Sequence, residues 1–204
     1  MGSEARGAAR ANAGASGAPE RIIAAAQRLF PRRGYRGTSM DDIAEEAGLA
    51  KATLYLHFDG KDAIYRALFD RCRGEIAVRT KAAEQADGPL AERLTALIYA
   101  YIGTALEFFG DVNHLRDAHV IVAADPARFG ATGEQDLDGR IAAMLKRAAR
   151  QDEIVLAGRS TSPSTIAGVL SDLARGAKVE GITPAQYKIR ISRACSIIVA
   201  GIAK

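Results

Sequence analysis

Residues 49–61 read LAKATLYLHFDGK, and their pattern is the strongest indication of how the N-terminal part of the chain folds. At helical spacing Leu54 and Phe58 lie about one turn apart and face inward. The opposite side carries no acid, but a cation, a hydroxyl, a phenol and an imidazole: Lys51, Thr53, Tyr55 and His57. Side chains of these types bind phosphates and base-pair edges. The stretch therefore predicts a short helix with one apolar seam and a nucleic-acid-binding face.

A second short helix is predicted directly before it, over MDDIAEEA. Its apolar residues fall at i, i+3, i+4 and i+7: Met40, Ile43, Ala44 and Ala47. Thr38 or Ser39 can cap its start, and Gly48 can adopt the left-handed conformation that ends a helix. Two short helices across a tight turn indicate either a helix-turn-helix with its second helix free to enter a major groove, or an ordinary helical hairpin with a polar exposed face.

The run from about Arg21 to Leu68 resembles the DNA-binding domain of TetR/AcrR-family transcriptional regulators. The matching pieces follow in order: a first helix ending in Phe30, then Gly34-Tyr35, Thr38-Ser39, Ile43-Ala44, Thr53-Leu54-Tyr55-X-His57-Phe58, and Lys61. Two positions depart from the family pattern. Ala50 and Gly60 stand where the family usually has helix-capping hydroxyl residues, and a lost cap costs about 1 kcal/mol.

The resemblance implies DNA-binding roles for eight residues: Arg36, Thr38, Lys51, Ala52, Thr53, Tyr55, His57 and Lys61. The first three residues of the recognition helix would reach base edges or the phosphates beside them, and its phenol and imidazole would hydrogen-bond phosphates. Thr38 and Lys61, each near a helix start, would clamp the DNA backbone from either side. Arg36 would contact a groove or a phosphate.

Length and composition are those of a globular protein of 204 residues, with 48% hydrophobic and 25% charged residues. The net charge of +4 favours an anionic partner only weakly. Between Glu20 and Lys61 seven Lys/Arg stand against six Asp/Glu, so the nucleic-acid argument depends on where the charges lie. Four of those acids belong to the MDDIAEEA helix.

The compartment expected from the sequence is the cytoplasm. Cys72 and Cys195 lie far apart among apolar neighbours at helical spacing, which is typical of buried thiols in a reducing environment. No apolar run approaches the roughly 20 residues of a membrane span, and the N-terminus lacks the apolar core of a signal peptide.

We expect an all-α protein of about nine helices in two domains. A disordered arm covers 1–18, the helix-turn-helix domain 19–65, and a helical ligand-binding and dimerisation domain 66–204. The helices of the second domain are expected at about 61–86 (shared with the first), 90–109, 113–123 and 132–151, followed by two opened by Ser162-Pro163 and Thr183-Pro184. The helix that begins at Lys61 would link the domains.

Enzymatic chemistry is not indicated. The three histidines, His57, His114 and His119, lack the i, i+4 spacing of helical metal ligands, and there is no Cys-X-X-Cys. No glycine-rich phosphate loop follows a strand. We therefore predict no catalytic residue, metal site or cofactor; a helical-bundle enzyme would need acid and base groups converging in a cavity.

The family resemblance implies a small-molecule pocket in the C-terminal domain and a homodimer formed by the last two helices, about 163–180 and 184–203. Candidate pocket residues are the aromatic and polar groups on the surrounding helices: Tyr99, Tyr101, Phe108, His114, His119 and Met144. The resulting hypothesis is a repressor that binds a palindromic operator as a homodimer and is released by a small-molecule effector. The alternative is a helical protein-interaction module that keeps the fold without operator binding.

Overall fold

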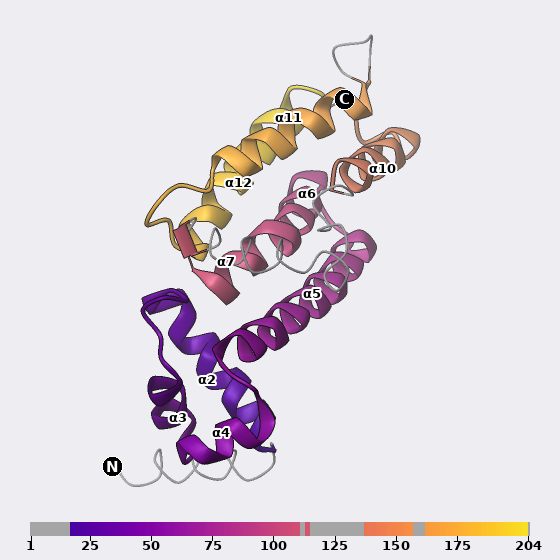
Figure 1. The fold of residues 1–204 in the computed structure, drawn as a ribbon. Helices are drawn as coiled ribbons and strands as arrows, with labels where there is room; N and C mark the ends of the chain where they lie inside the picture. The colour runs from indigo at the N-terminus through magenta and orange to yellow at the C-terminus, as the bar shows by residue number, and fades with distance from the viewer. Residues whose placement is uncertain (1–16, 111–112, 115–136, 157–161, 204) are drawn as a thin grey trace, which may run out of the picture.

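A computed structural model of the chain describes residues 17–110, 113–114, 137–156 and 162–203. Figure 1 shows a small N-terminal unit joined by one long helix to a larger helical bundle. The described helices are α2 (Ala18–Arg33), α3 (Met40–Ala47), α4 (Lys51–His57), α5 (Lys61–Gln85), α6 (Leu90–Ile98), η2 (Tyr99–Gly103), α7 (Thr104–Phe109), α10 (Leu137–Arg150), α11 (Pro163–Gly176) and α12 (Pro184–Ala200). The predicted all-α class, with an N-terminal helix-turn-helix domain and a C-terminal bundle, is confirmed.

Helices α2, α3 and α4 form the N-terminal unit. The apolar residues at helical spacing in α2 are buried: Ile22, Ala26, Leu29 and Phe30. Ser39 caps α3 by accepting the backbone N–H of Asp42, whose side chain in turn accepts the N–H of Ser39. Gly48 ends α3 in the left-handed region, with φ 62° and ψ 40°. Leu54 of α4 is fully buried, and Phe58, directly after the helix, is half-buried against the core, so the predicted turn is present and the two apolar residues face inward.

The linking helix α5 runs without interruption through the domain boundary expected after residue 65. Its inward residues Ile64, Leu68 and Cys72 are buried at four-residue spacing. In Figure 1, α5 starts inside the N-terminal unit and continues along the bundle. At the other end of the chain the expected arm, 1–18, lies outside the described residues except for its last two, and Ala18 already belongs to α2.

The helix expected over 90–109 is continuous, but its central turn is a π-helix. In η2 the amide N–H of Thr104 donates to the carbonyl of Tyr99, five residues back, so this turn holds one residue more than an α-helical turn. Gly110, with φ 83°, ends α7. Most of the α6–η2–α7 helix is buried, as its all-round apolar composition predicts.

The C-terminal helices begin where the sequence indicates. The hydroxyls of Ser162 and Thr183 accept the N3 amides of α11 and α12, and a proline follows each cap. On α11, Leu170 is buried, whereas Val169 and Leu173 are about half exposed, so its apolar residues form an inner and an outer row. The expected helix 113–123, beyond residue 114, and the first turn expected from 132 lie outside the described residues.

The described part of the chain contains one isolated antiparallel bridge, between Ile154 and Ala203, and no named strand. None of its helices has both the length and the apolar character needed to cross a bilayer. Nor do three His, Cys, Asp or Glu side chains come together there as a metal site would require.

Both cysteines are buried, and burial raises the pKa of Cys72 to about 12 and that of Cys195 to about 11. Only a thiolate attacks a disulfide reagent. At pH 8 we therefore expect Ellman's reagent to label the native protein roughly 100-fold more slowly than an exposed thiol, and to label both cysteines at once in guanidinium. Rapid labelling of either thiol in the native protein would contradict the buried positions.

Candidate nucleic-acid interface and bundle cavity

The outer face of α4 is exposed. Tyr55 has 51% of its surface accessible, and Lys51, Ala52 and His57 are exposed as well, while Thr53 is half-buried. The face also presents Leu56, 81% exposed, which the sequence reasoning did not single out. Its spacing of two from buried Leu54 was the available signal, since residues two apart on a helix point in different directions.

The arginines of α2 hold α3 against it. Arg33 pairs with Asp42 (Nη1–Oδ1 2.7 Å) and Arg28 with Glu46 (Nε–Oε1 2.5 Å). Arg21 donates from Nη2 to the carbonyl of Ala47, 2.7 Å away, at the end of α3. These contacts engage two of the acids of α3 with cations of α2, while α4 itself carries no carboxylate.

The cation of α4 itself is paired. Lys51 Nζ lies 2.9 Å from the carboxylate of Asp41 on α3, and that hydrogen bond raises the pKa of Lys51. Both side chains are solvent-exposed, so the pair contributes little to stability. It does fix the direction in which Lys51 points when no other anion is present.

Two predicted DNA contacts lie inside the unit. Lys61 Nζ donates to the carbonyls of Tyr35 and Thr38, each at 2.7 Å, and lies 4.2 Å from the centre of the Tyr35 ring. Thr38 is 1% exposed, and its hydroxyl donates to the carbonyl of Gly34. Thr38 and Lys61 are predicted to clamp DNA. In the structure their side chains instead form hydrogen bonds that hold the α2–α3 loop. Arg36 is exposed on that loop.

Comparisons with known proteins agree with this geometry. Residues 22–68 match the sequence model of a family described as bacterial regulatory proteins, tetR family. Residues 22–68 thus form a DNA-binding domain of the TetR type. The match contains all eight residues to which the family resemblance gave DNA-binding roles. A family of regulatory proteins also agrees with the expectation that the chain is not an enzyme.

Curated relatives match the N-terminal domain. The biofilm operon icaADBC HTH-type negative transcriptional regulator IcaR of Staphylococcus epidermidis is 43% identical over 53 residues, 26% of this chain and 29% of IcaR. The IcaR of Staphylococcus aureus strain Newman is 45% identical over 53 residues, 26% of this chain and 28% of that protein. The chain thus matches less than a third of the length of these relatives.

Solved structures extend the likeness to the whole TetR-family fold. PfmR of Thermus thermophilus has a TM-score of 0.64 at 20% identity, covering 90% of this chain and 100% of that one. A TetR-family regulator of Agrobacterium tumefaciens has a TM-score of 0.62 at 21% identity, covering 92% and 98%. At these identities the likeness establishes the fold, including the bundle.

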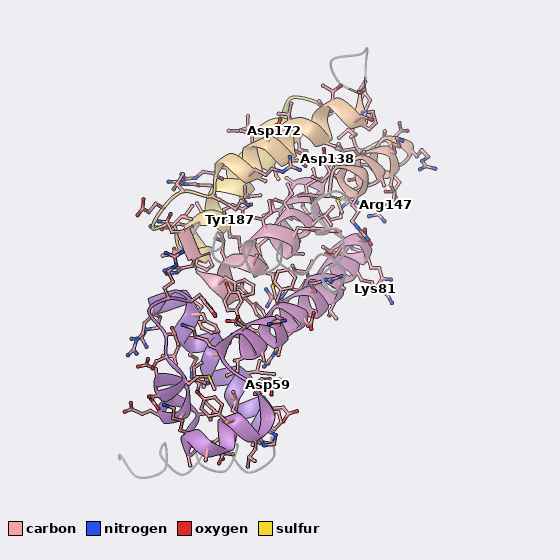
Figure 2. All side chains as sticks on the ribbon, in the orientation of Figure 1. Asp59, Lys81, Asp138, Arg147, Asp172 and Tyr187 are labelled. Carbon is pink, nitrogen blue, oxygen red and sulfur yellow. The ribbon has the colours of Figure 1, made fainter. Side chains whose placement is uncertain are left out.

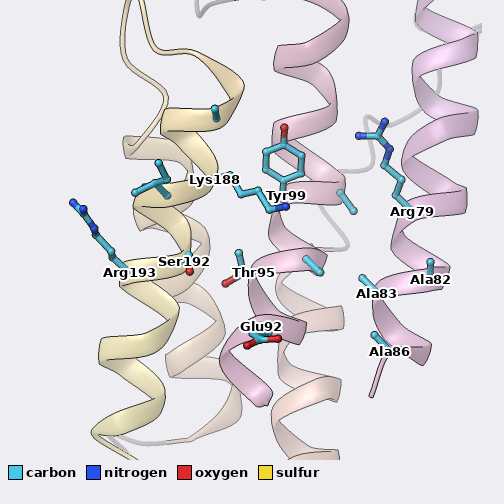
Figure 3. Close-up of a pocket in the computed structure, with 14 residues that line it drawn as sticks. Arg79, Ala82, Ala83, Ala86, Glu92, Thr95, Tyr99, Lys188, Ser192 and Arg193 are labelled. Carbon is cyan, nitrogen blue, oxygen red and sulfur yellow. The ribbon is translucent and has the colours of Figure 1, made fainter. Parts of the chain in front are cut away.

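The helical bundle has an open cavity of about 1040 Å³ between α5, the α6–η2 helix and α12 (Figure 3). Small apolar side chains make up much of its wall, with charged and hydroxyl groups among them: Arg79, Ala82, Ala83, Ala86, Glu92, Thr95, Ala96, Tyr99, Ala100, Ala185, Lys188, Ile189, Ser192 and Arg193. A volume of this size accommodates a drug-sized molecule.

Of the six predicted pocket residues, Tyr99 lines this cavity. Phe108 and Met144 are buried in the core, and the Tyr101 ring lies 6.0 Å from the guanidinium of Arg140. His114 lies against Gly34 and Gly110, close to the N-terminal unit. His119 lies outside the described residues. Arg79 and Lys188 were not among the predicted pocket residues, because only the packing of α5 and α12 against η2 brings them to one place.

We expect Lys61→Met to lower the free energy of unfolding by about 2 kcal/mol, because it removes a charged donor from two backbone carbonyls. Guanidinium titration followed by circular dichroism measures the change. Lys81→Met is the matched control, since Lys81 is exposed on the same helix, far from the N-terminal unit (Figure 2). Equal stability of the two variants would show that the Lys61 bonds contribute nothing.

Proposed function

We propose that this chain is a homodimeric transcriptional repressor of the TetR family that binds a palindromic operator through α4 and is released by a small molecule in its bundle. The observation that carries the proposal is the exposed, acid-free face of α4 within a helix-turn-helix unit of this family. The IcaR relatives are named negative regulators, which supports repression as the direction.

Each group on this face has a role that its chemistry supports. Lys51, Ala52 and Thr53 stand at the start of α4 and would reach base edges or adjoining phosphates, with the alanine methyl able to contact thymine. The exposed phenol of Tyr55 and imidazole of His57 would hydrogen-bond phosphates. Arg36 would bind the backbone from the α2–α3 loop, while Thr38 and Lys61 hold that loop in place from within.

A second copy of the chain is the proposed occupant of the outer face of α11 and α12. Large apolar side chains are exposed there, among them Leu173 and, at 73% exposure, Ile197. Between the two helices lies a groove of about 710 Å³ lined by Val169, Asp172, Leu173, Gly176, Ala177, Arg190, Ile191 and Ala194. Two such faces would bury each other in a four-helix contact. Pairing would place two α4 helices on half-sites about 34–36 Å apart.

The cavity beside Tyr99 is the proposed effector site. A molecule bound there can release the operator only to the extent that it binds the released arrangement more tightly. Since half-sites are one helical turn apart, a change of a few ångströms in the spacing of the paired α4 helices is enough to lose register.

The proposal is tested by selecting duplexes from a random library with the full chain and measuring their affinity by gel shift. We expect Lys51→Ala and Tyr55→Ala each to weaken binding by about 5- to 50-fold, because each removes a contact to DNA. Lys146→Ala, on the exposed side of α10, is the control and should bind as the unmodified chain does. A chain that retains no duplex at low salt, or variants that bind equally, would favour the protein-interaction module instead.

The Lys51–Asp41 pair gives a second prediction for the same assay. Asp41→Asn frees Lys51 for DNA, so affinity should rise about two- to fivefold, the range of an exposed ion pair. Glu45→Gln removes an equal charge from an exposed position on the same helix and controls for long-range repulsion. In a Lys51→Ala background the gain from Asp41→Asn should shrink to that of Glu45→Gln. An unchanged gain in that background would mean that Lys51 is not the group released.

A further inference from the structure

Tyr99 stands at the irregular turn of the central helix. It is the first residue of η2, and its ring folds back over Gly103, where a Cβ would lie 2.3 Å from a ring carbon. Only glycine leaves room for the ring in this position. π-turns are rare because their hydrogen bonds are less favourable than those of an α-helix, and they occur frequently at functional sites. The position of the ring therefore depends on the glycine at the end of the π-turn.

Tyr99, Glu107, Arg79 and Glu75 form a hydrogen-bonded cluster between helices, which we call the polar latch. The hydroxyl of Tyr99 donates to Glu107 Oε1 at 2.6 Å, and the other oxygen of that carboxylate accepts from Arg79 Nη1 at 2.7 Å. Arg79 also donates to Glu75 at 2.6 Å. The latch thus joins α5, η2 and α7. Burial, and then the Glu107 carboxylate, raise the pKa of Tyr99, so the phenol keeps its proton and remains a donor at neutral pH.

A molecule in the cavity would touch this latch directly. Tyr99 and Arg79 both line the wall, and Lys188 Nζ on α12 lies 5.5 Å from the centre of the Tyr99 ring. Figure 3 shows the side chains of Tyr99 and Arg79 extending toward the same end of the cavity, with Lys188 reaching toward Tyr99 from α12. The latch therefore lies at one end of a wall whose exposed surface is mostly apolar, with Glu92, Ser192 and Arg193 among its other polar groups.

The C-terminal end of α7 packs against the N-terminal unit. The Phe109 ring lies 5.3 Å from that of Tyr65, which in turn lies 4.9 Å from Phe30 of α2. Gly110 approaches the backbone of Pro31 so closely that a Cβ there would lie 2.6 Å from the Pro31 carbonyl oxygen. A rotation or shift of α7 cannot be absorbed at such a contact and must move α2.

We propose that Tyr99 is the residue that senses the effector, and that the effector is a mostly apolar molecule whose hydrogen-bond acceptor takes the Tyr99 hydroxyl from Glu107. This rests on the proposed function of the cavity as effector site. Once the hydroxyl leaves Glu107, the π-turn is free to relax to an α-helical turn, which holds one residue fewer. That change would rotate α7 about its axis by about 100°. Even part of that rotation would move α2, because Phe109 packs on Tyr65 and Gly110 lies against Pro31.

The test compares Tyr99→Phe with Tyr101→Phe in the full chain by amide hydrogen exchange. Tyr101→Phe makes the same chemical change two residues away, at a residue outside the cavity wall. We expect Tyr99→Phe to speed exchange about tenfold, the effect of one lost charge-assisted hydrogen bond, both in 99–109 and in the last turn of α2. Gly103→Ala, which displaces the ring and keeps the hydroxyl, should give the same pattern.

Operator affinity supplies the second readout. Without any ligand, Tyr99→Phe should bind the selected duplex about three- to tenfold more weakly, because it mimics the effector-bound arrangement, while Tyr101→Phe should bind as the unmodified chain does. Faster exchange confined to η2, or two tyrosine variants that behave alike, would overturn the sensing role. Failure of the unmodified chain to bind any duplex would instead overturn the proposed function, and the exchange comparison would still decide the coupling.

Discussion

The ammonium group of Lys61 is the contact on which the arrangement of the N-terminal unit depends. By donating to two carbonyls of the loop between α2 and α3, it ties the first residue of α5 to the segment that positions both short helices. Replacing those bonds would require water to enter a partly buried site. The angle between α5 and the helix-turn-helix is therefore set by charge-assisted hydrogen bonds, and α5 carries that constraint into the bundle.

The two parts of the chain meet through aromatic rings instead of a flexible linker. Phe30, Tyr65 and Phe109 come from α2, α5 and α7, and their edge-on and tilted contacts leave little room for independent motion. Well-packed interfaces of this kind shift between discrete arrangements more readily than they deform. A cavity whose wall includes residues of α5 and η2 is thus mechanically connected to the face of α4 that we assign to DNA.

Much of the fold could be read from local signals in the sequence. Ser39 and Gly48 bound α3, and the Ser-Pro and Thr-Pro pairs open α11 and α12, because capping chemistry acts within a few residues. The inward position of Leu54 followed from spacing alone. The π-turn could not be predicted, since no local signal of the capping kind marks it, and the polar contacts of Tyr99 join residues of three helices. The same holds for Lys61 and Thr38, whose types suit phosphates equally well but whose hydrogen-bond partners lie on other segments.

In the proposed repressor, the exposed face of α4 meets DNA twice, once from each copy of the chain. Hydroxyl-radical footprinting on a selected duplex tests it most directly, because the cleavage pattern reports which sugars the protein covers on each strand. Two protected patches on one face of the duplex, with centres about 34–36 Å apart, are the predicted result. A single protected patch, or an unprotected duplex at low salt, would contradict paired binding through α4.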